Sequence, residues 1–143
     1  MKKLILILAI ASVSFVNAQK ISTSVVPVAV TSKFTSLYPD YKGEEWKKEK
    51  GNYEAKITQN TTKTYVVIDP SGNLVKTTTD IAVSELPAAV NDYVTKNYME
   101  QKITEASKTI EADGKIKYEA KVKENRLCFD ADGKYIKAEK RKS

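Results

Sequence analysis

Apolar and polar residues alternate with a period of two along much of the chain. In one segment, Ile116, Tyr118, Ala120 and Val122 are separated by charged residues. Such alternation is typical of strands with one buried and one solvated face. Short sequences rich in Gly, Asn and Asp separate the alternating segments and indicate tight turns. The pattern predicts strands at 44–50, 52–59, 62–69, 73–79, 102–111, 115–123, 125–130 and 133–139.

Two other segments have apolar residues spaced by three and four positions, as in an amphipathic helix. The first stripe comprises Val26, Val30, Phe34, Leu37 and Tyr38, and the second comprises Leu86, Val90, Tyr93, Val94 and Tyr98. Pro39 ends the first helix, because the residue before a proline disfavours the helical conformation. Ser84 is suited to cap the second, and Pro87 to its first turn.

The chain also repeats itself, at an offset of about 60 residues. Pro27, Ala29, Val30 and Tyr38 match Pro87, Ala89, Val90 and Tyr98, and Tyr53-Glu54-Ala55-Lys56 matches Tyr118-Glu119-Ala120-Lys121. We therefore expect an α+β fold of two tandem repeats, at 24–80 and 81–139, each a helix followed by four strands. The strands would form an antiparallel sheet with the helices packed on one face.

The N-terminus has the pattern of an export signal. Lys2 and Lys3 precede an apolar run from Leu4 to Phe15, and Ala18 provides the small residue that signal peptidase requires. The run is shorter than the roughly 20 residues that span a bilayer. We expect residues 1–18 to be a signal peptide cut after Ala18, a periplasmic or secreted mature chain without a membrane span, and a solvated basic tail at 140–143.

The amino-acid composition excludes several kinds of catalytic and metal-binding site. The 143 residues include 24 Lys and Arg, 18 Asp and Glu, no His and one Cys, with a net charge of +6. Lack of histidine excludes Ser-His-Asp and Cys-His catalysis and His-bound metals. Removal of Lys2 and Lys3 with the predicted signal peptide lowers the charge from +6 to +4, and a charge this small does not favour nucleic-acid binding. We expect no enzyme activity, no cofactor and no metal. Because Cys128 is the single cysteine, we expect a monomer, with a Cys128-linked dimer as the alternative.

The predicted strand register places one set of side chains on the sheet face opposite the helices. The set comprises Glu54, Lys56, Tyr65, Val67, Lys117, Glu119, Lys121 and Arg126. Charged residues with scattered apolar ones suit a protein partner or an extended peptide. Trp46 either packs under the first helix or serves as an anchor for a partner.

Several of these segments are also the basis of a family resemblance. They are the helix that opens Leu-Pro-Ala-Ala-Val at Leu86 and ends at Tyr98, the pair Glu45-Trp46, the stretch 51–55 and the Asp-x-x-Gly hairpins. Together they resemble the PepSY-like family of beta-lactamase-inhibitor-like proteins, over about residues 24 to 138. The resemblance implies an envelope or secreted protein with two tandem repeats that binds proteins or peptides, with inhibition as one use. No catalytic residues carry over from it.

Two binding functions stay open, and a purely structural role in the envelope is a third alternative. One is an exported, non-catalytic module that binds a protein or peptide and could inhibit a protease or another hydrolase. The other is a periplasmic protein that binds a small molecule or an envelope polymer between helix and sheet. A pocket lined by tyrosines would favour the second function, whereas an open sheet face would favour the first.

Overall fold

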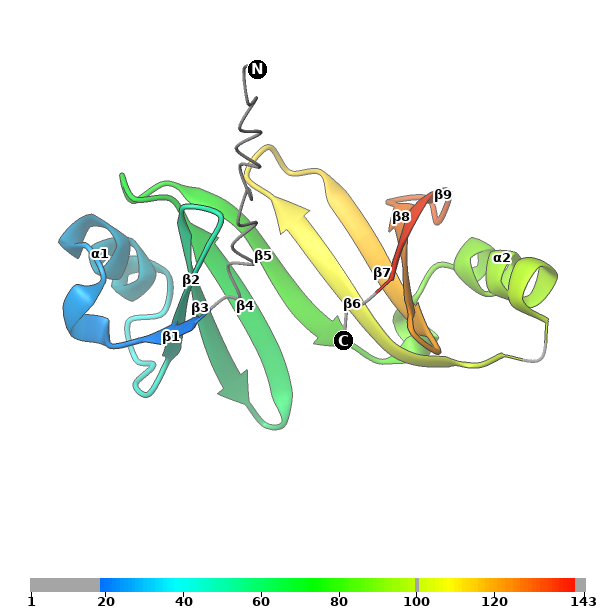
Figure 1. Ribbon diagram of the computed structural model, residues 1–143, viewed down its shortest axis with the longest axis horizontal. Helices are drawn as coiled ribbons and strands as arrows, with labels where there is room; N and C mark the ends of the chain where they lie inside the picture. The colour runs from blue at the N-terminus through cyan, green and yellow to red at the C-terminus, as the bar shows by residue number, and fades with distance from the viewer. Residues whose placement is uncertain (1–18, 100, 141–143) are drawn as a thin grey trace, which may run out of the picture.

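The computed structural model describes residues 19–99 and 101–140, and its strands form one antiparallel sheet. Nine strands lie in chain order, so that each pairs with the next (Figure 1). The strands are β1 (Gln19–Ile21), β2 (Glu45–Glu49), β3 (Asn52–Gln59), β4 (Thr62–Ile68), β5 (Leu74–Ile81), β6 (Ile103–Glu111), β7 (Ile116–Val122), β8 (Asn125–Asp130) and β9 (Tyr135–Lys140). Eight of them lie within about two residues of the predicted ranges, the usual uncertainty of strand ends.

Two helices interrupt the sequence of strands. Helix α1 (Val28–Leu37) lies between β1 and β2, and α2 (Ala88–Tyr98) lies between β5 and β6. Each follows a short 3-10 helix, Thr23–Val25 or Val83–Glu85. Pro27 and Pro87 directly precede them, and proline is tolerated there because the first amides of a helix have no intrahelical acceptor.

Both helices cover the same face of the sheet. Directly opposed residues of antiparallel strands point to one face, so the face can be followed from strand to strand. Under α1 the register joins Ala55 to Val66, Val66 to Thr77 and Thr77 to Ile110. The same face continues from Ile110 to Ile116 on β7. Figure 1 shows α1 and α2 at opposite ends of the molecule, with the central strands between them.

Each helix packs over its own apolar cluster. The α1 cluster comprises Val26, Val30, Phe34, Trp46, Tyr53, Ala55, Ile57, Val66 and Ile68. The α2 cluster comprises Leu86, Val90, Val94, Ala106, Ala120, Val122, Leu127 and Phe129. Full burial of one large apolar side chain contributes about 1.5–3 kcal/mol. The two clusters therefore account for much of what holds the helices to the sheet.

The prediction of two tandem helix-plus-four-strand repeats is wrong. Strands β5 and β6, assigned to different repeats, pair from Lys76 opposite Glu111 to Ile81 opposite Ala106. Thr78 Oγ1 and Thr109 Oγ1 form a further hydrogen bond of 2.8 Å across this junction. Two separate repeats would each leave an edge strand with unpaired N–H and C=O groups, and the junction pairs those edges. The broader α+β class agrees with the structure, and β1 is an additional strand.

Two further predictions concern the chain ends. The predicted signal peptide at 1–18 lies outside the described residues, as do the last three residues of the predicted tail. Lys140, its first residue, ends β9. Within the described part of the chain, no helix is long and apolar enough to cross a membrane.

Candidate binding face

The sheet face opposite the helices, here called the open face, holds all eight predicted site residues. The register passes from Lys56 to Tyr65, Tyr65 to Thr78, Thr78 to Thr109 and Thr109 to Lys117. Glu54 pairs with Val67, and both lie on this face as well. Glu119 and Lys121 alternate with Lys117 along β7, and Lys121 faces Arg126 on β8. The continuous sheet thus brings the predicted residues of both halves to one surface.

The open face is hollowed into a groove of about 920 Å³. Its lining comprises Glu49, Glu54, Lys63, Tyr65, Lys76, Thr78, Asp80, Ile81, Thr104, Glu105, Ala106, Ser107, Thr109, Glu119, Lys121 and Arg126. Five predicted residues line it: Glu54, Tyr65, Glu119, Lys121 and Arg126. Lys56, Val67 and Lys117 lie on the open face but not in this lining.

The sequence pattern does not predict the middle of the groove. Thr78 and Asp80 come from β5, and Ser107 and Thr109 come from β6. Along residues 76–80 both alternating sets are polar, since Thr77 and Thr79 separate Lys76, Thr78 and Asp80. Alternation in such a strand does not tell which face is buried. The available signal was the polar character of both sets, which indicates a strand away from the apolar clusters.

Ion pairs fix several of the basic side chains. Arg126 donates a hydrogen bond to Glu119, and this contact raises the pKa of the guanidinium. Lys121 Nζ lies 2.9 Å from Glu105 Oε1. Exposed pairs of this kind contribute only about 0–1 kcal/mol to stability. Their main effect here is to hold charged ends in place along the groove.

Glu45 holds a second group of charges at the β2 end of the open face. Its carboxylate lies 3.3 Å from both Lys56 Nζ and Lys20 Nζ. The hydrogen bond from Lys56, followed by that from Lys20, lowers the pKa of Glu45. Lys56 is therefore oriented along the sheet toward β2.

Glu54 differs from Glu45, Glu105 and Glu119, which all form ion pairs. Among the residues that the structure describes, it has no ion-pair partner within 4.0 Å and no side-chain hydrogen bond. Burial raises the pKa of its carboxyl, and the nearby Glu49 raises it further, against the opposing influence of Lys47 and Lys76. Glu54 is therefore a half-buried acid in the groove that is open to a cationic partner group.

Tyr65 shows how far the sheet curves. Burial raises the pKa of its phenol most, and Asp80 adds to this, whereas Lys56 and then Arg126 lower it. Arg126 belongs to β8, four strands away from β4 in the sheet order. Tyr65 and Arg126 nevertheless line the same groove, so the two halves of the open face turn toward each other across it.

Trp46 packs in the core under α1, which was the first of the two roles considered for it. Its side chain is 2% exposed and packs edge-on against Phe34, with ring centroids 5.4 Å apart. The indole Nε1–H donates to Glu44 Oε1 at 3.4 Å. Trp46 is thus not available as an anchor for a partner.

Cys128 lies on the open face, between Glu119 on β7 and Lys137 on β9. It is partly buried, and this burial is the largest cause that raises the pKa of its thiol. A raised pKa keeps the thiol protonated and lowers its reactivity. The arrangement is that of a small side chain on a strand.

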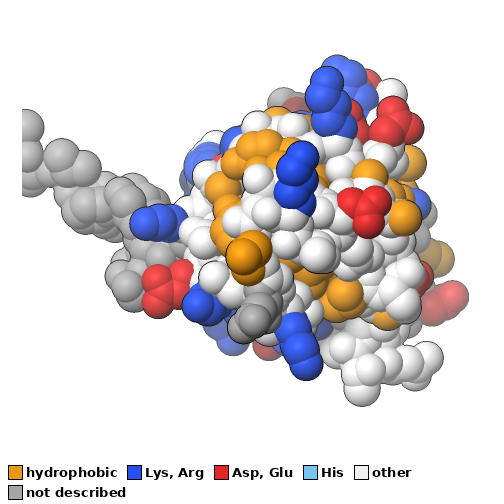
Figure 2. Space-filling model, turned by 90° about the vertical axis from the view of Figure 1, so that its right-hand side faces the viewer, with side chains coloured by type: hydrophobic (Ala, Val, Ile, Leu, Met, Phe, Trp, Pro, Cys, Tyr) orange, Lys and Arg blue, Asp and Glu red, His pale blue; other side chains and the backbone are white. Residues whose placement is uncertain are grey.

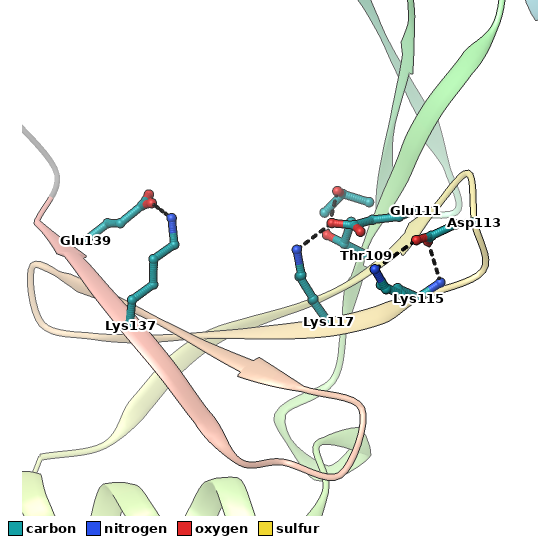
Figure 3. Close-up of polar contacts among 8 residues, drawn as sticks. Thr109, Glu111, Asp113, Lys115, Lys117, Lys137 and Glu139 are labelled. Carbon is teal, nitrogen blue, oxygen red and sulfur yellow. Dashed lines mark hydrogen bonds and ion pairs between the residues drawn. The ribbon is translucent and has the colours of Figure 1, made fainter.

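Lysines and acids also pair beside the groove, near the β6–β7 hairpin. Lys117 Nζ lies 2.5 Å from Glu111 Oε1, and Lys115 Nζ lies 3.1 Å from Asp113 Oδ2 (Figure 3). Over the described residues, no group of three or more Cys, Asp or Glu side chains is placed to hold a metal ion. The α2 end of the molecule has a mixed surface, where apolar side chains lie among basic and acidic ones (Figure 2).

The protein has an α+β fold, with a curved antiparallel sheet, helices on one face of it and a charged groove on the other. The sequence model of the PepSY-like family, described as beta-lactamase-inhibitor-like, matches residues 14–76 and 52–137. The chain belongs to this family. A search of curated proteins found no match.

Solved structures share the fold. A protein from Bacteroides eggerthii described as periplasmic is 20% identical, with a TM-score of 0.73 over 80% of this chain and 88% of its own. A DUF2874 family protein from Bacteroides ovatus is 23% identical, with a TM-score of 0.70 over 80% and 86%. A BLIP-like protein from Bacteroides fragilis is 17% identical, with a TM-score of 0.62 over 78% and 84%. At these identities the similarity extends to the fold alone.

Proposed function

We propose that this protein is an exported, non-catalytic binding module whose groove receives a protein or peptide partner. Export is supported by Lys2, Lys3 and the apolar run that follows them, with a cut after Ala18. It is also supported by the description of the Bacteroides eggerthii structure as periplasmic. Inhibition of a hydrolase is the use that the family description and the BLIP-like structural relative favour.

The observation that carries the binding proposal is the character of the groove. Nine of its sixteen lining residues are charged, five acidic and four basic, and they surround hydroxyl groups and the ring of Tyr65. A small-molecule pocket is usually enclosed and mostly apolar, whereas a protein interface tolerates many charged groups at its rim. The groove lies on the open face, its lining includes no residue of α1 or α2, and Tyr65 is its single tyrosine. These features favour a protein or peptide over a small molecule.

The absence of catalysis is part of the proposal and rests on the sequence. Without histidine, general acid–base work at neutral pH would fall to carboxylates or lysines with strongly shifted pKa values. The groove residues Glu119, Lys121 and Arg126 are instead engaged in ion pairs. Incubation of the purified protein with peptidase, esterase, glycosidase and lactamase substrates should give no turnover.

A matched pair of charge reversals tests the groove. Lys121 and Lys115 are both ion-paired with a nearby acid, but Lys121 lines the groove and Lys115 does not. The immobilised protein would be used to select from a displayed peptide library and from a Bacteroides periplasmic extract. Lys121→Glu should weaken the selected interaction at least about tenfold, because loss of a favourable charge contact in an interface costs roughly 1.4 kcal/mol or more.

Lys115→Glu should bind like the unchanged protein, and both variants should keep the circular dichroism spectrum. Equal binding by the unchanged protein and Lys121→Glu would move the partner site away from the groove. Any hydrolase captured from the extract would be titrated with the protein. Inhibition should saturate at one molecule per enzyme and should be weakened by Lys121→Glu to the same extent as binding.

A further inference from the structure

Strand β9 is an exposed edge of the sheet. It stands last in the strand order and, among the described residues, pairs with β8 alone. The five residues from Ile136 to Lys140 are all exposed. An edge of this kind presents unpaired N–H and C=O groups that can pair with another strand. At the other edge of the described sheet, β1 offers three residues only, Gln19–Ile21.

The charges on β9 are arranged symmetrically about one residue. In the β8–β9 ladder Lys137 lies opposite Cys128 and Glu139 lies opposite Arg126. Both charged side chains therefore lie on the open face. Ala138 separates them. Lys137 Nζ and Glu139 Oε1 are 2.5 Å apart, with side chains 59% and 56% exposed, and Figure 3 shows the lysine pointing toward the carboxylate along β9. On the open face, β9 thus carries one positive and one negative group two positions apart, both accessible.

We propose that a second copy of this chain pairs its own β9 antiparallel with this edge, about a two-fold axis at Ala138. In that register Lys137 of each copy faces Glu139 of the other, which gives two cross-strand ion pairs. Opposite charges placed directly across an antiparallel ladder stabilise it, and like charges destabilise it. Two-fold dimers that use one surface twice are the commonest closed assemblies.

The charge pattern selects this register against its neighbours. A shift by two residues would place Lys137 opposite Lys137, or Glu139 opposite Glu139. A shift by one residue would put the open faces of the two copies on opposite sides of the joined sheet, since successive side chains alternate. At the axis itself Ala138 meets Ala138, and the small side chain allows the strands to approach. Ile136, which is 48% exposed, comes opposite Lys140, whose alkyl chain can cover it.

The two-fold arrangement also predicts that the contact is non-covalent. Cys128 lies on β8, so the two thiols are separated by three strand spacings, or roughly 14 Å. This exceeds the reach of a disulfide. A six-residue strand is a short interface, so the dimer is expected to be weak and concentration-dependent. Both grooves would face the same side of the joined sheet. The pairing does not depend on what the grooves bind.

Sedimentation equilibrium of the protein expressed from its full sequence, over about 10 µM to 1 mM, tests the proposal. The unchanged protein should dimerise. Lys137→Glu and Glu139→Lys should each weaken dimerisation at least about tenfold. Either substitution places like charges opposite each other on both sides of the two-fold axis. The double variant Lys137→Glu/Glu139→Lys restores opposite charges across the axis and should recover the dimer. Both substituted positions are exposed, and circular dichroism checks that each of the three variants is folded.

A monomer throughout the range, or single variants that dimerise like the unchanged protein, would overturn the proposal. So would a dimer that dissociates on addition of dithiothreitol, since that result indicates a Cys128 link. In a Cys128→Ser background, Ala138→Cys should form a cross-linked dimer under mild oxidation, because the two Cα atoms would lie about 4.5–5.5 Å apart. Failure to cross-link in a protein that still dimerises would place the interface elsewhere.

Discussion

Glu54 illustrates how the environment of one side chain affects the stability of the whole chain. Its carboxyl is half-buried on the open face, and burial is the largest cause that raises its pKa. A raised pKa means that the folded state holds the proton more tightly than the unfolded state does. As pH rises through the ordinary Glu pKa, about 4.3, the unfolded chain ionises first and folding loses free energy. The ionised Glu54 is therefore a destabilising group at neutral pH.

Glu54→Gln should raise the melting temperature at pH 7 and have a much smaller effect well below the ordinary Glu pKa. Glutamine removes the charge whose desolvation opposes folding, and at low pH the carboxyl is already neutral in both states. Glu45→Gln provides a control of opposite sign, because Lys56 and Lys20 lower the pKa of Glu45. That variant should lose stability at pH 7 and approach the unchanged protein in acid. Thermal melts of both variants across pH check the pair, and a loss of stability in Glu54→Gln at pH 7 would contradict the argument.

At the residue scale, the sequence pattern predicts which side chains lie on the open face. It does not predict which of them form ion pairs or have shifted pKa values. Alternation of charged and apolar positions suffices to separate Glu54 from Tyr53 and Ala55. The unpaired state of Glu54 depends on its cross-strand neighbours, Lys47 and Val67, which pattern alone does not identify. The role of Trp46 stayed open for the same reason, since its packing partner Phe34 lies in another element.

At the scale of elements, two hairpins hold the helices in position. The β4–β5 turn at 69–73 is closed by Asp69, whose carboxylate accepts hydrogen bonds from the backbone amides of Ser71 and Asn73, each at 2.9 Å. Gly72 in this turn has a φ of +88° and lies against the first turn of α1. A Cβ added there would lie 2.7 Å from the carbonyl oxygen of Ala29. The turn at 130–134 places Gly133 at the start of α2, where an added Cβ would lie 3.0 Å from the side chains of Pro87 and Ala89.

Gly72→Ala should destabilise the protein more than Gly114→Ala. Gly114 has a similar φ, +86°, with nothing within 4 Å of an added Cβ. Both substitutions incur the left-handed backbone cost of about 1–2 kcal/mol, so their difference isolates the contact with α1. That contact involves backbone of α1 and cannot be relieved by rotation of a flexible side chain. Urea unfolding of both variants measures the difference, and equal losses of stability would indicate that the hairpin is not held tightly against α1.

Element boundaries show what a periodic pattern can and cannot detect. Strands of five residues or more were predicted to within about two residues. Strand β1 was missed because Gln19–Ile21 is too short to show a period, and it is a strand only through its pairing with β2. The register shifts at Val67/Ile68 and Cys128/Phe129 were missed as well, since a bulge depends on the partner strand.

At the scale of the whole molecule, the main error was to expect two tandem helix-plus-four-strand repeats where the structure has one nine-stranded sheet. Internal similarity identifies a repeated unit, but it does not tell whether the edges of two units join. That information lies in the pairing of residues 76–81 with 106–111, which are separated along the chain by α2. Only the joined sheet creates the groove, because its lining runs from β2 to β8 across the junction. The candidate binding site is therefore a property of the complete sheet.

The joined sheet also predicts cooperative unfolding, which the substitution Phe129→Ala would test. Phe129 is fully buried in the α2 cluster, and its truncation should cost about 3–5 kcal/mol. Trp46, the only tryptophan, lies in the α1 cluster and reports on the other end of the molecule. If the β5–β6 ladder couples the two clusters, Phe129→Ala should lower the denaturation midpoint seen by Trp46 fluorescence as much as the midpoint seen by circular dichroism.

Val28→Ala, at a position that is 79% exposed, should move neither midpoint appreciably. A Trp46 midpoint that stays unchanged while circular dichroism shows two steps would mean that the two clusters unfold independently despite the shared sheet.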